Sequence, residues 1–128
     1  MENDRLMDEW LSLAKMDFDT AEFLYENMVP QPFEIICYHC QQASEKYLKA
    51  LFVHFKIPLL KTHDLGLLAE TLDPYLEMED EVLDACDNLT PFGVKFRYPH
   101  ELFIEAYHVE RALKDMLIVR DWAMAVFA

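Results

Sequence analysis

Glycine and basic residues are scarce in this chain of 128 residues. Its 2 glycines, Gly66 and Gly93, are too few to build a glycine-rich phosphate loop or a dinucleotide-binding fingerprint. Basic residues number 11 against 24 acidic ones, which gives a formal net charge of −13. A free-standing protein that binds nucleic acid without sequence preference is expected to be basic. These two shortages disfavour the common nucleotide-binding folds and general nucleic-acid binders.

Long apolar runs are also missing, and cysteines are few. No apolar run approaches the length of roughly 20 residues that spans a bilayer, and the chain starts with polar and acidic residues rather than an apolar signal segment. The 3 cysteines, Cys37, Cys40 and Cys86, are expected to be reduced core residues. Cys37 and His39 point to nearly opposite sides of a helix, so their spacing does not predict a zinc site. We therefore expect a cytoplasmic protein without a metal, a cofactor or membrane contact.

The apolar residues recur at the three- and four-residue spacing of amphipathic helices. Long helices are predicted over residues 6–28 and 33–56, with prolines between and after them. Thr62 is a candidate N-cap for a short third helix, and an acidic fourth helix is predicted over 78–90. A loop over 90–99 then leads to a last long helix, predicted to begin at Pro99. The pattern predicts one all-α domain over residues 1–128, an antiparallel (up-and-down) bundle of about five helices, three long and two short.

The second predicted helix carries the densest group of polar side chains beside an apolar face that would include His54. Its polar edge steps by three, four and three residues, through His39, Gln42, Lys46 and Lys49. Such an edge suits hydrogen bonds and charge pairing with a phosphate or a base. The structural alternative is that Glu45 and Lys49 form an ordinary salt bridge on a solvated face, and that His39 is a core histidine bonded to a neighbour.

Asp17 is expected near the inner stripe of the first helix, where a carboxylate needs partners. We expect it to meet His39, Lys46 or a backbone donor as a structural polar contact rather than as a catalytic group. His63 stands where the third helix should begin, and it is a candidate either to cap that helix or to reach a ligand.

The segment Lys95–His100 is the best anion-site candidate in the chain. Its two cations, Lys95 and Arg97, precede the expected N-terminus of the last helix, where backbone N–H groups are free to bind anions. Tyr98 adds a stacking face and a hydroxyl. Equally, Arg97 would pair with one of the many carboxylates while Tyr98 packs. Six of the 11 basic residues lie between positions 46 and 97, which favours an anion site confined to one cleft. The acidic remainder suits a partner with a basic face.

Three segments, taken in order, carry a resemblance to a known family. The first is Tyr38–Ala50, with the pattern His-x-x-Gln-Ala-x-Glu-Lys-x-Leu-Lys-Ala; the others are Thr62-His63-Asp64-Leu65 and Arg97-Tyr98-Pro99. Together with Trp10, Ala14 and Asp17 in the first helix, they resemble the HEPN family of small all-α domains. The resemblance implies a helical bundle that usually dimerises, with a cleft between the two protomers. Many members are encoded beside a minimal nucleotidyltransferase and form toxin–antitoxin pairs with it.

The resemblance also implies two activities. Some family members cut RNA without a metal, with an Arg followed after four to six residues by a His; Arg stabilises the phosphorane charge and His moves protons. Other members are thought to bind nucleotides only. Here Arg97 is followed by His100 after two residues and by His108 after ten, so neither spacing matches. Arg97, His100 and His108 are the catalytic candidates, Arg97 is expected in the cleft, and no complete catalytic pair is carried over.

The sequence therefore predicts a HEPN module that binds a nucleotide or another phosphate ligand. The resemblance implies that it would act as a homodimer, with a nucleotidyltransferase-like partner, in a pair of the toxin–antitoxin kind. The expected ligand-binding residues are Lys46, Lys49, His63, Arg97 and Tyr98. Two alternatives stay open: a metal-independent ribonuclease that acts as a toxin on RNA, and a purely structural protein–protein interaction module.

Overall fold

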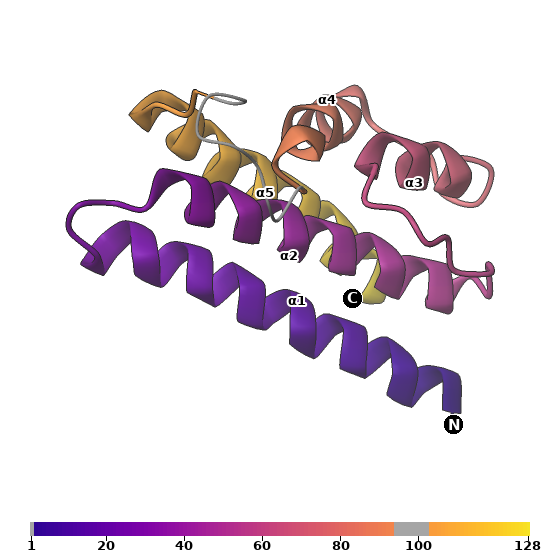
Figure 1. Cartoon of the computed structure of the whole chain (residues 1–128). Coiled ribbons are helices and arrows are strands. Elements are labelled where there is room, and N and C mark those ends of the chain that lie inside the picture. The colour runs from indigo at the N-terminus through magenta and orange to yellow at the C-terminus, as the bar shows by residue number, and fades with distance from the viewer. Residues whose placement is uncertain (1, 94–102) are drawn as a thin grey trace.

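The computed structural model describes residues 2–93 and 103–128, and this part of the chain is helical with no strand. The long helices run side by side, and the short helices gather beyond α2 and α5 (Figure 1). The elements are α1 (Glu2–Asn27), α2 (Phe33–His54), α3 (Leu65–Leu72), α4 (Asp80–Leu89), the 3-10 helix η1 (Thr90–Gly93) and α5 (Ala106–Phe127). The predicted all-α bundle with three long and two short helices is confirmed. Predictions for residues 94–102 lie outside the described part.

Helix α2 forms the centre of the bundle. It packs against α1 on one side and α5 on the other, and it also contacts α3, α4 and η1. Because it has neighbours almost all round, its side chains are buried almost continuously from Ile36 to Val53, apart from a few partly exposed positions. The inward position predicted for His54 was wrong, since this residue is exposed at the end of the helix. Polar Gln41 and Glu45 are buried instead.

The two outer long helices present regular apolar stripes to α2. The stripe of α1 consists of Ala14, Phe18 and Ala21. Its two alanines have little bulk, so the helix axes can approach closely. The stripe of α5 follows steps of three and four residues: Val109, Ala112, Met116, Val119 and Ala123. Together these stripes leave the far side of each outer helix in solvent.

The N-cap of α3 is Asp64 and not Thr62 as the sequence predicted. The Asp64 side chain accepts a hydrogen bond from Leu67 N at 3.2 Å, which satisfies one unpaired donor of the first turn. Thr62 supports this turn from outside, because its Oγ1 accepts from Asp64 N at 3.1 Å. The cap therefore fixes the connection that carries His63, directly before the helix.

The last helix begins at Ala106, seven residues later than the predicted start at Pro99. Residues 103–105 are described and are not helical. Glu105 is the N-cap, and its side chain accepts from the backbone of His108. In return, Glu105 N donates to His108 Nδ1 at 2.9 Å. This reciprocal cap explains why the helix begins at Ala106 rather than at the predicted Pro99.

The three cysteines are buried thiols, as predicted. Burial raises the pKa of the Cys86 thiol to about 12 and raises that of Cys40 well above its usual value. Both of these thiols are therefore protonated and unreactive at neutral pH. Within the described residues, no helix is both long and apolar enough to cross a bilayer.

Candidate functional site

A polar network, the α2 network, runs along the side of α2 that faces α1 and the α2–α3 connection, and Asp17 of α1 lies at one end of it. Its members are Asp17, His39, Gln41, Gln42, Glu45, Lys46, Lys49 and His63. His39 Nδ1 lies 2.8 Å from Asp17 Oδ1, and Lys46 Nζ donates to Asp17 Oδ2. Burial raises the pKa of Asp17, but the hydrogen bonds and charges of His39 and Lys46 outweigh that effect and hold the pKa below its usual value. The predicted contact of Asp17 with His39 and Lys46 is thus confirmed.

Glu45 anchors the other end and is almost fully buried, with 3% of its surface exposed. Three donors reach its carboxylate: His63 Nδ1 at 2.8 Å, Lys49 Nζ at 2.9 Å and Gln41 Nε2 at 3.2 Å. Gln41 also donates to the backbone oxygen of His63 at 3.0 Å. Because the carboxylate has several donors, its burial is compensated, and the α2–α3 connection is tied to α2.

Neighbouring glutamines extend the Glu45 end of the network, and a glycine packs against Gln41. Gln42 Nε2 donates to Gln41 Oε1 at 2.7 Å, so Gln42 continues the network from Gln41 toward the polar edge of α2. A Cβ atom at Gly93 would lie only 2.9 Å from the Gln41 amide. Gly93 therefore lets the end of η1 approach the buried amide closely.

The structure brings two of the predicted ligand residues together and separates a third. Lys49 and His63 meet at Glu45, whereas Lys46 pairs with Asp17. The Glu45–Lys49 pair exists, but its predicted place on a solvated face was wrong, because the side chains are only 4% and 11% exposed. The cause is the central position of α2, which has neighbours almost all round. Lys46 is also largely buried, at 20% exposed.

The remaining predicted site residues lie elsewhere or outside the described part. His108 is on α5, where its Nδ1 accepts the capping hydrogen bond from Glu105 N. That acceptor role places the proton on Nε2 of the neutral ring, so this nitrogen acts as a donor. Arg97, Tyr98 and His100 fall within residues 94–102, outside the described residues.

Sequence reasoning treated Glu45 as a surface partner of Lys49 and gave no role to Gln41. Both residues face the α2–α3 connection, and sequence periodicity alone does not reveal which side of α2 this connection covers. Trp10 was named for the family resemblance, but its contact with Lys49 was not predicted: Lys49 Nζ lies 5.6 Å from its ring centroid. The buried Trp10 Nε1 has no hydrogen-bond partner among the described residues.

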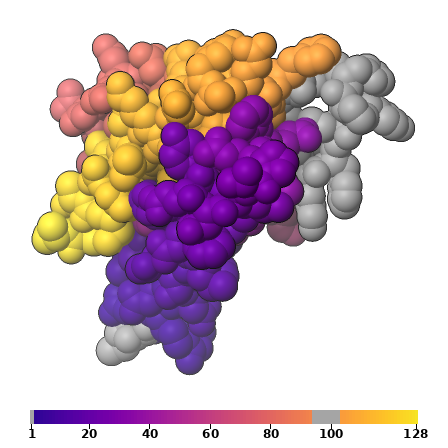
Figure 2. Space-filling view, turned by 90° about the vertical axis from the view of Figure 1, so that its left-hand side faces the viewer, coloured from indigo at the N-terminus to yellow at the C-terminus, as the bar shows by residue number. Residues whose placement is uncertain are grey.

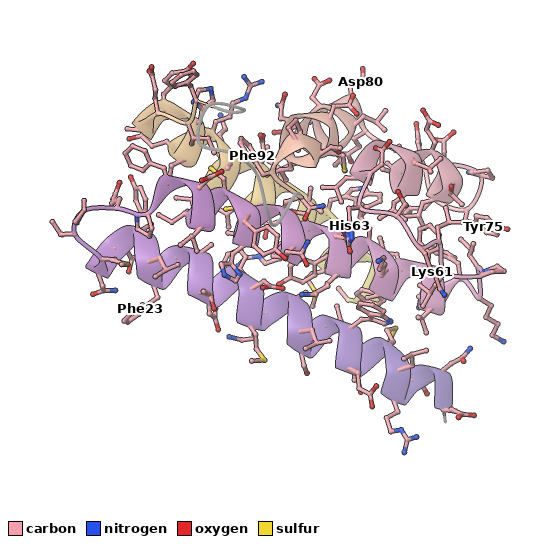
Figure 3. The ribbon with its side chains drawn as sticks, viewed as in Figure 1. Phe23, Lys61, His63, Tyr75, Asp80 and Phe92 are labelled. Atoms are coloured by element: carbon pink, nitrogen blue, oxygen red, sulfur yellow. The ribbon has the colours of Figure 1, made fainter. Side chains whose placement is uncertain are left out.

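His63 is the network's most exposed group, with 69% of its side chain accessible. Figure 3 shows it against α2, in the connection that leads to α3. A carboxylate can only accept, so Nδ1 must donate to Glu45, and Nε2 lies on the ring's opposite side. A buried carboxylate that orients an exposed imidazole suits hydrogen bonding to a phosphate oxygen or proton transfer. His63 is therefore the residue of this site best placed to contact a ligand.

A surface hollow with a volume of about 600 Å³ lies between α1 and α5, on another side of the molecule. Figure 2 shows these two helices beside each other at the surface. The cations that line this hollow already have partners. Lys15 pairs with Asp19 at 2.7 Å. Arg120 pairs with Asp121, and its guanidinium lies 4.5 Å from the Phe18 ring centroid. Within the described residues, no group of three or more His, Cys, Asp or Glu side chains has a metal-binding arrangement.

Comparisons with known proteins agree with this architecture. The chain superimposes on the crystal structure of ST0689, an archaeal HEPN homologue, with a TM-score of 0.75 and 17% identity, covering 95% of this chain and 98% of the other. It also matches the crystal structure of TT1696 from Thermus thermophilus, with a TM-score of 0.80 and 20% identity, covering 93% and 96%. At such identities the two structures show the fold alone. No curated protein matches the sequence.

The family comparison is more specific, because it rests on the sequence. The model of the HEPN domain matches residues 7–126, which is nearly the whole chain. The matched range includes the α2 network and the connection that carries His63. The chain belongs to the HEPN domain family.

Proposed function

We propose that this chain, over residues 1–128, is a cytoplasmic HEPN module that binds a nucleotide through its phosphate groups on the exposed side of the α2 network. The observation that carries the proposal is the arrangement of His63, whose exposed imidazole is held by the buried Glu45 at 2.8 Å. An imidazole fixed at Nδ1 presents Nε2 to a ligand in one orientation. That preorganisation reduces the entropy lost on binding.

The lysines have a supporting role in this proposal. Lys46 and Lys49 are each paired with a carboxylate, so their charges are largely offset inside the network. Their hydrogen bonds to Asp17 and Glu45 help to fix the two carboxyl groups that contact His39 and His63. The net attraction for a phosphate then depends on His63 and on Arg97 and Tyr98, the two further residues that the sequence predicts for this site.

We further propose that the module works as a homodimer and with a nucleotidyltransferase-like protein, in a pair of the toxin–antitoxin kind. Two features support association. The outer side of α1 exposes large apolar side chains, with Leu13 at 45%, Met16 at 65% and Phe23 at 63%. The net charge of −13 favours a partner with a basic face.

A titration of ADP and ATP without metal, followed by calorimetry, tests the binding proposal. We expect binding by the native chain and a loss of about tenfold or more in His63→Ala, since a charge-assisted hydrogen bond to phosphate is removed. Lys15→Ala is the matched control, because this exposed lysine also pairs with a carboxylate but lies on α1, with 72% of its side chain accessible. Equal affinities of His63→Ala and the native chain would contradict the proposal. Nucleotide-independent complex formation with a neighbour-encoded protein would favour the interaction module.

A metal-independent ribonuclease is the second candidate, and the same Glu45–His63 pair favours it. A carboxylate-oriented imidazole is the usual arrangement of a general base, which this reaction needs at the ribose 2′-OH. The test is cleavage of a single-stranded RNA in the presence of a chelator. Activity that disappears in both His63→Ala and Arg97→Ala would support it. Activity unchanged in both variants would point to a contaminating nuclease.

A further inference from the structure

Two adjoining hollows between α4 and α5 share three residues, Asn88, Arg111 and Asp115. The first has a volume of about 310 Å³ and is also lined by Phe92, Phe103 and His108. The second, of about 520 Å³, is lined on its outer side by further acidic residues of both helices. Neither hollow is lined by a residue of the α2 network. Asp115 stands where the two hollows meet.

Asp115 is buried, with 6% of its surface exposed, yet its carboxylate is incompletely bonded. Oδ2 has no hydrogen-bond partner among the residues that the structure describes. Arg111 Nε, one turn earlier on α5, approaches Oδ2 only to 4.0 Å, and the arginine side chain is 63% exposed. A buried carboxylate oxygen normally has a donor, because leaving it unbonded is costly. Asp115 lines both hollows, but Oδ2 itself is enclosed in this structure, so a donor from either hollow reaches it only when Arg111 moves aside.

The surroundings of Asp115 set the charge of that donor. Four further carboxylates line the two hollows, against the two cations Arg111 and Lys114; they belong to Glu81, Asp84, Asp87 and Glu110. Burial raises the pKa of Asp115, and the charge of Asp84 adds to this, while Asn88, Arg111 and Lys114 oppose it. The balance is an excess of negative charge that a bound cation would offset.

Aromatic rings at the rim suit an organic cation rather than a metal ion. Phe103 is 78% exposed and Tyr107 is 59% exposed, one beside each hollow. Exposed ring faces attract guanidinium and ammonium groups and also cover the alkyl chain that carries them. Volumes of a few hundred cubic ångströms are of the size that binds small molecules.

We infer that the paired hollow between α4 and α5 binds a small organic cation of the alkylguanidine or alkylamine class, with its N–H groups on Asp115 Oδ2. Arg111 is then an internal competitor that covers the carboxylate when the ligand is absent. The ligand displaces it without any covalent step. This site is separate from the α2 network and takes ligands of the opposite charge.

Calorimetric titration with butylguanidine tests the inference, with the neutral isostere butylurea as the matched ligand. We expect butylguanidine to bind and butylurea to bind at least about tenfold more weakly, because only the first supplies a charge-assisted hydrogen bond. Asp115→Asn should lose about tenfold or more in affinity. Arg111→Ala should bind more tightly than the native chain, since the competitor is gone. Asp121→Asn is the control, as an acid of the same helix that is exposed and paired with Arg120.

The signs of these effects separate a built site from general surface attraction. Equal losses in Asp115→Asn and Asp121→Asn, or weaker binding in Arg111→Ala, would overturn the inference. So would the absence of binding by both the native chain and Arg111→Ala at millimolar ligand. The comparison of butylguanidine with butylurea uses the native chain, so it decides the matter even if Asp115→Asn fails to fold. None of these outcomes bears on nucleotide binding at His63.

Discussion

Two carboxylates of similar burial, Glu45 on α2 and Asp115 on α5, differ in their partners. They are 3% and 6% exposed. Glu45 receives hydrogen bonds from His63, Lys49 and Gln41, whereas Asp115 Oδ2 has no hydrogen-bond partner among the described residues and only Arg111 Nε at 4.0 Å. The first is compensated within the fold and stabilises it. The second keeps hydrogen-bonding capacity that a ligand can use, so the number of donors matters more than burial.

The largest expected effect on stability is that of removing Glu45, the centre of its hydrogen-bonded cluster. Glu45→Ala leaves the largely buried Lys49 without its carboxylate and releases the connection at His63. We expect a loss of about 3 kcal/mol in the free energy of unfolding, measured with urea, as for other broken buried pairs. Asp19→Ala, which removes an exposed partner of Lys15, should change it by less than about 0.5 kcal/mol. Similar losses in the two variants would show that burial of the Glu45 pair has no consequence.

Gly93→Ala should also lower stability, because it crowds Gln41 next to Glu45 rather than because it changes a charge. The new Cβ atom would lie 2.9 Å from the Gln41 amide, which is held by hydrogen bonds to Glu45 and to the backbone of His63. Because Gln41 cannot move without breaking these bonds, we expect a loss of about 2 kcal/mol in urea unfolding. In a Gln41→Ala background, which has already lost these hydrogen bonds, adding Gly93→Ala should cost much less. A cost of the same size in that background would mean that the backbone, and not Gln41, resists the substitution.

Asp17→Asn should lower stability at neutral pH by about 1 to 2 kcal/mol, because the hydrogen bonds from His39 and Lys46 then reach a neutral group. The pKa of Asp17 in the fold lies below its usual value. Its contribution is therefore present above the unfolded-state pKa of about 3.9 and is lost as the pH falls through the folded-state value. Thermal unfolding at several pH values should show the difference from the native chain shrinking in acid. A difference that stays constant down to low pH would contradict this assignment.

Asp115→Asn should have the opposite sign and the smallest size. The pKa of Asp115 in the fold is raised by burial, so its favourable contribution is present below the unfolded-state pKa and is lost as the pH rises through the folded-state value. At neutral pH the variant should therefore be more stable than the native chain, by up to about 1 kcal/mol. The same thermal series measures it, and the gain should vanish in acid. A loss of stability at neutral pH would show that Asp115 is better paired than the described contacts indicate.

Much of the fold followed from local sequence. Apolar residues at three- and four-residue spacing placed the five helices, and prolines marked two of the turns, because helix geometry and proline chemistry act over a few residues. The start of the last helix was missed. Its cap depends on the reciprocal contact between Glu105 and the His108 side chain. In the sequence, the proline at position 99 was the stronger signal for a helix start.

The candidate site was predictable only in part. The spacing of His39 and Lys46 on one edge of α2, opposite Asp17, was enough to anticipate the first polar cluster. Glu45 was assigned to the surface, because an i,i+4 pair with Lys49 looks the same on a solvated helix as on a buried one. Nothing local indicates that the chain returns to place His63 over that pair.

The sequence by itself determined the helices, the all-α class and the family, because periodicity and ordered motifs are written along the chain. Only the tertiary structure decided which charges are compensated. Burial and hydrogen-bond partners arise where helices meet, at distances along the chain of 18 residues for Glu45 and His63 and 29 for Asp17 and Lys46. For Asp115, the meeting of α4 and α5 leaves the carboxylate buried with one oxygen unbonded among the described residues.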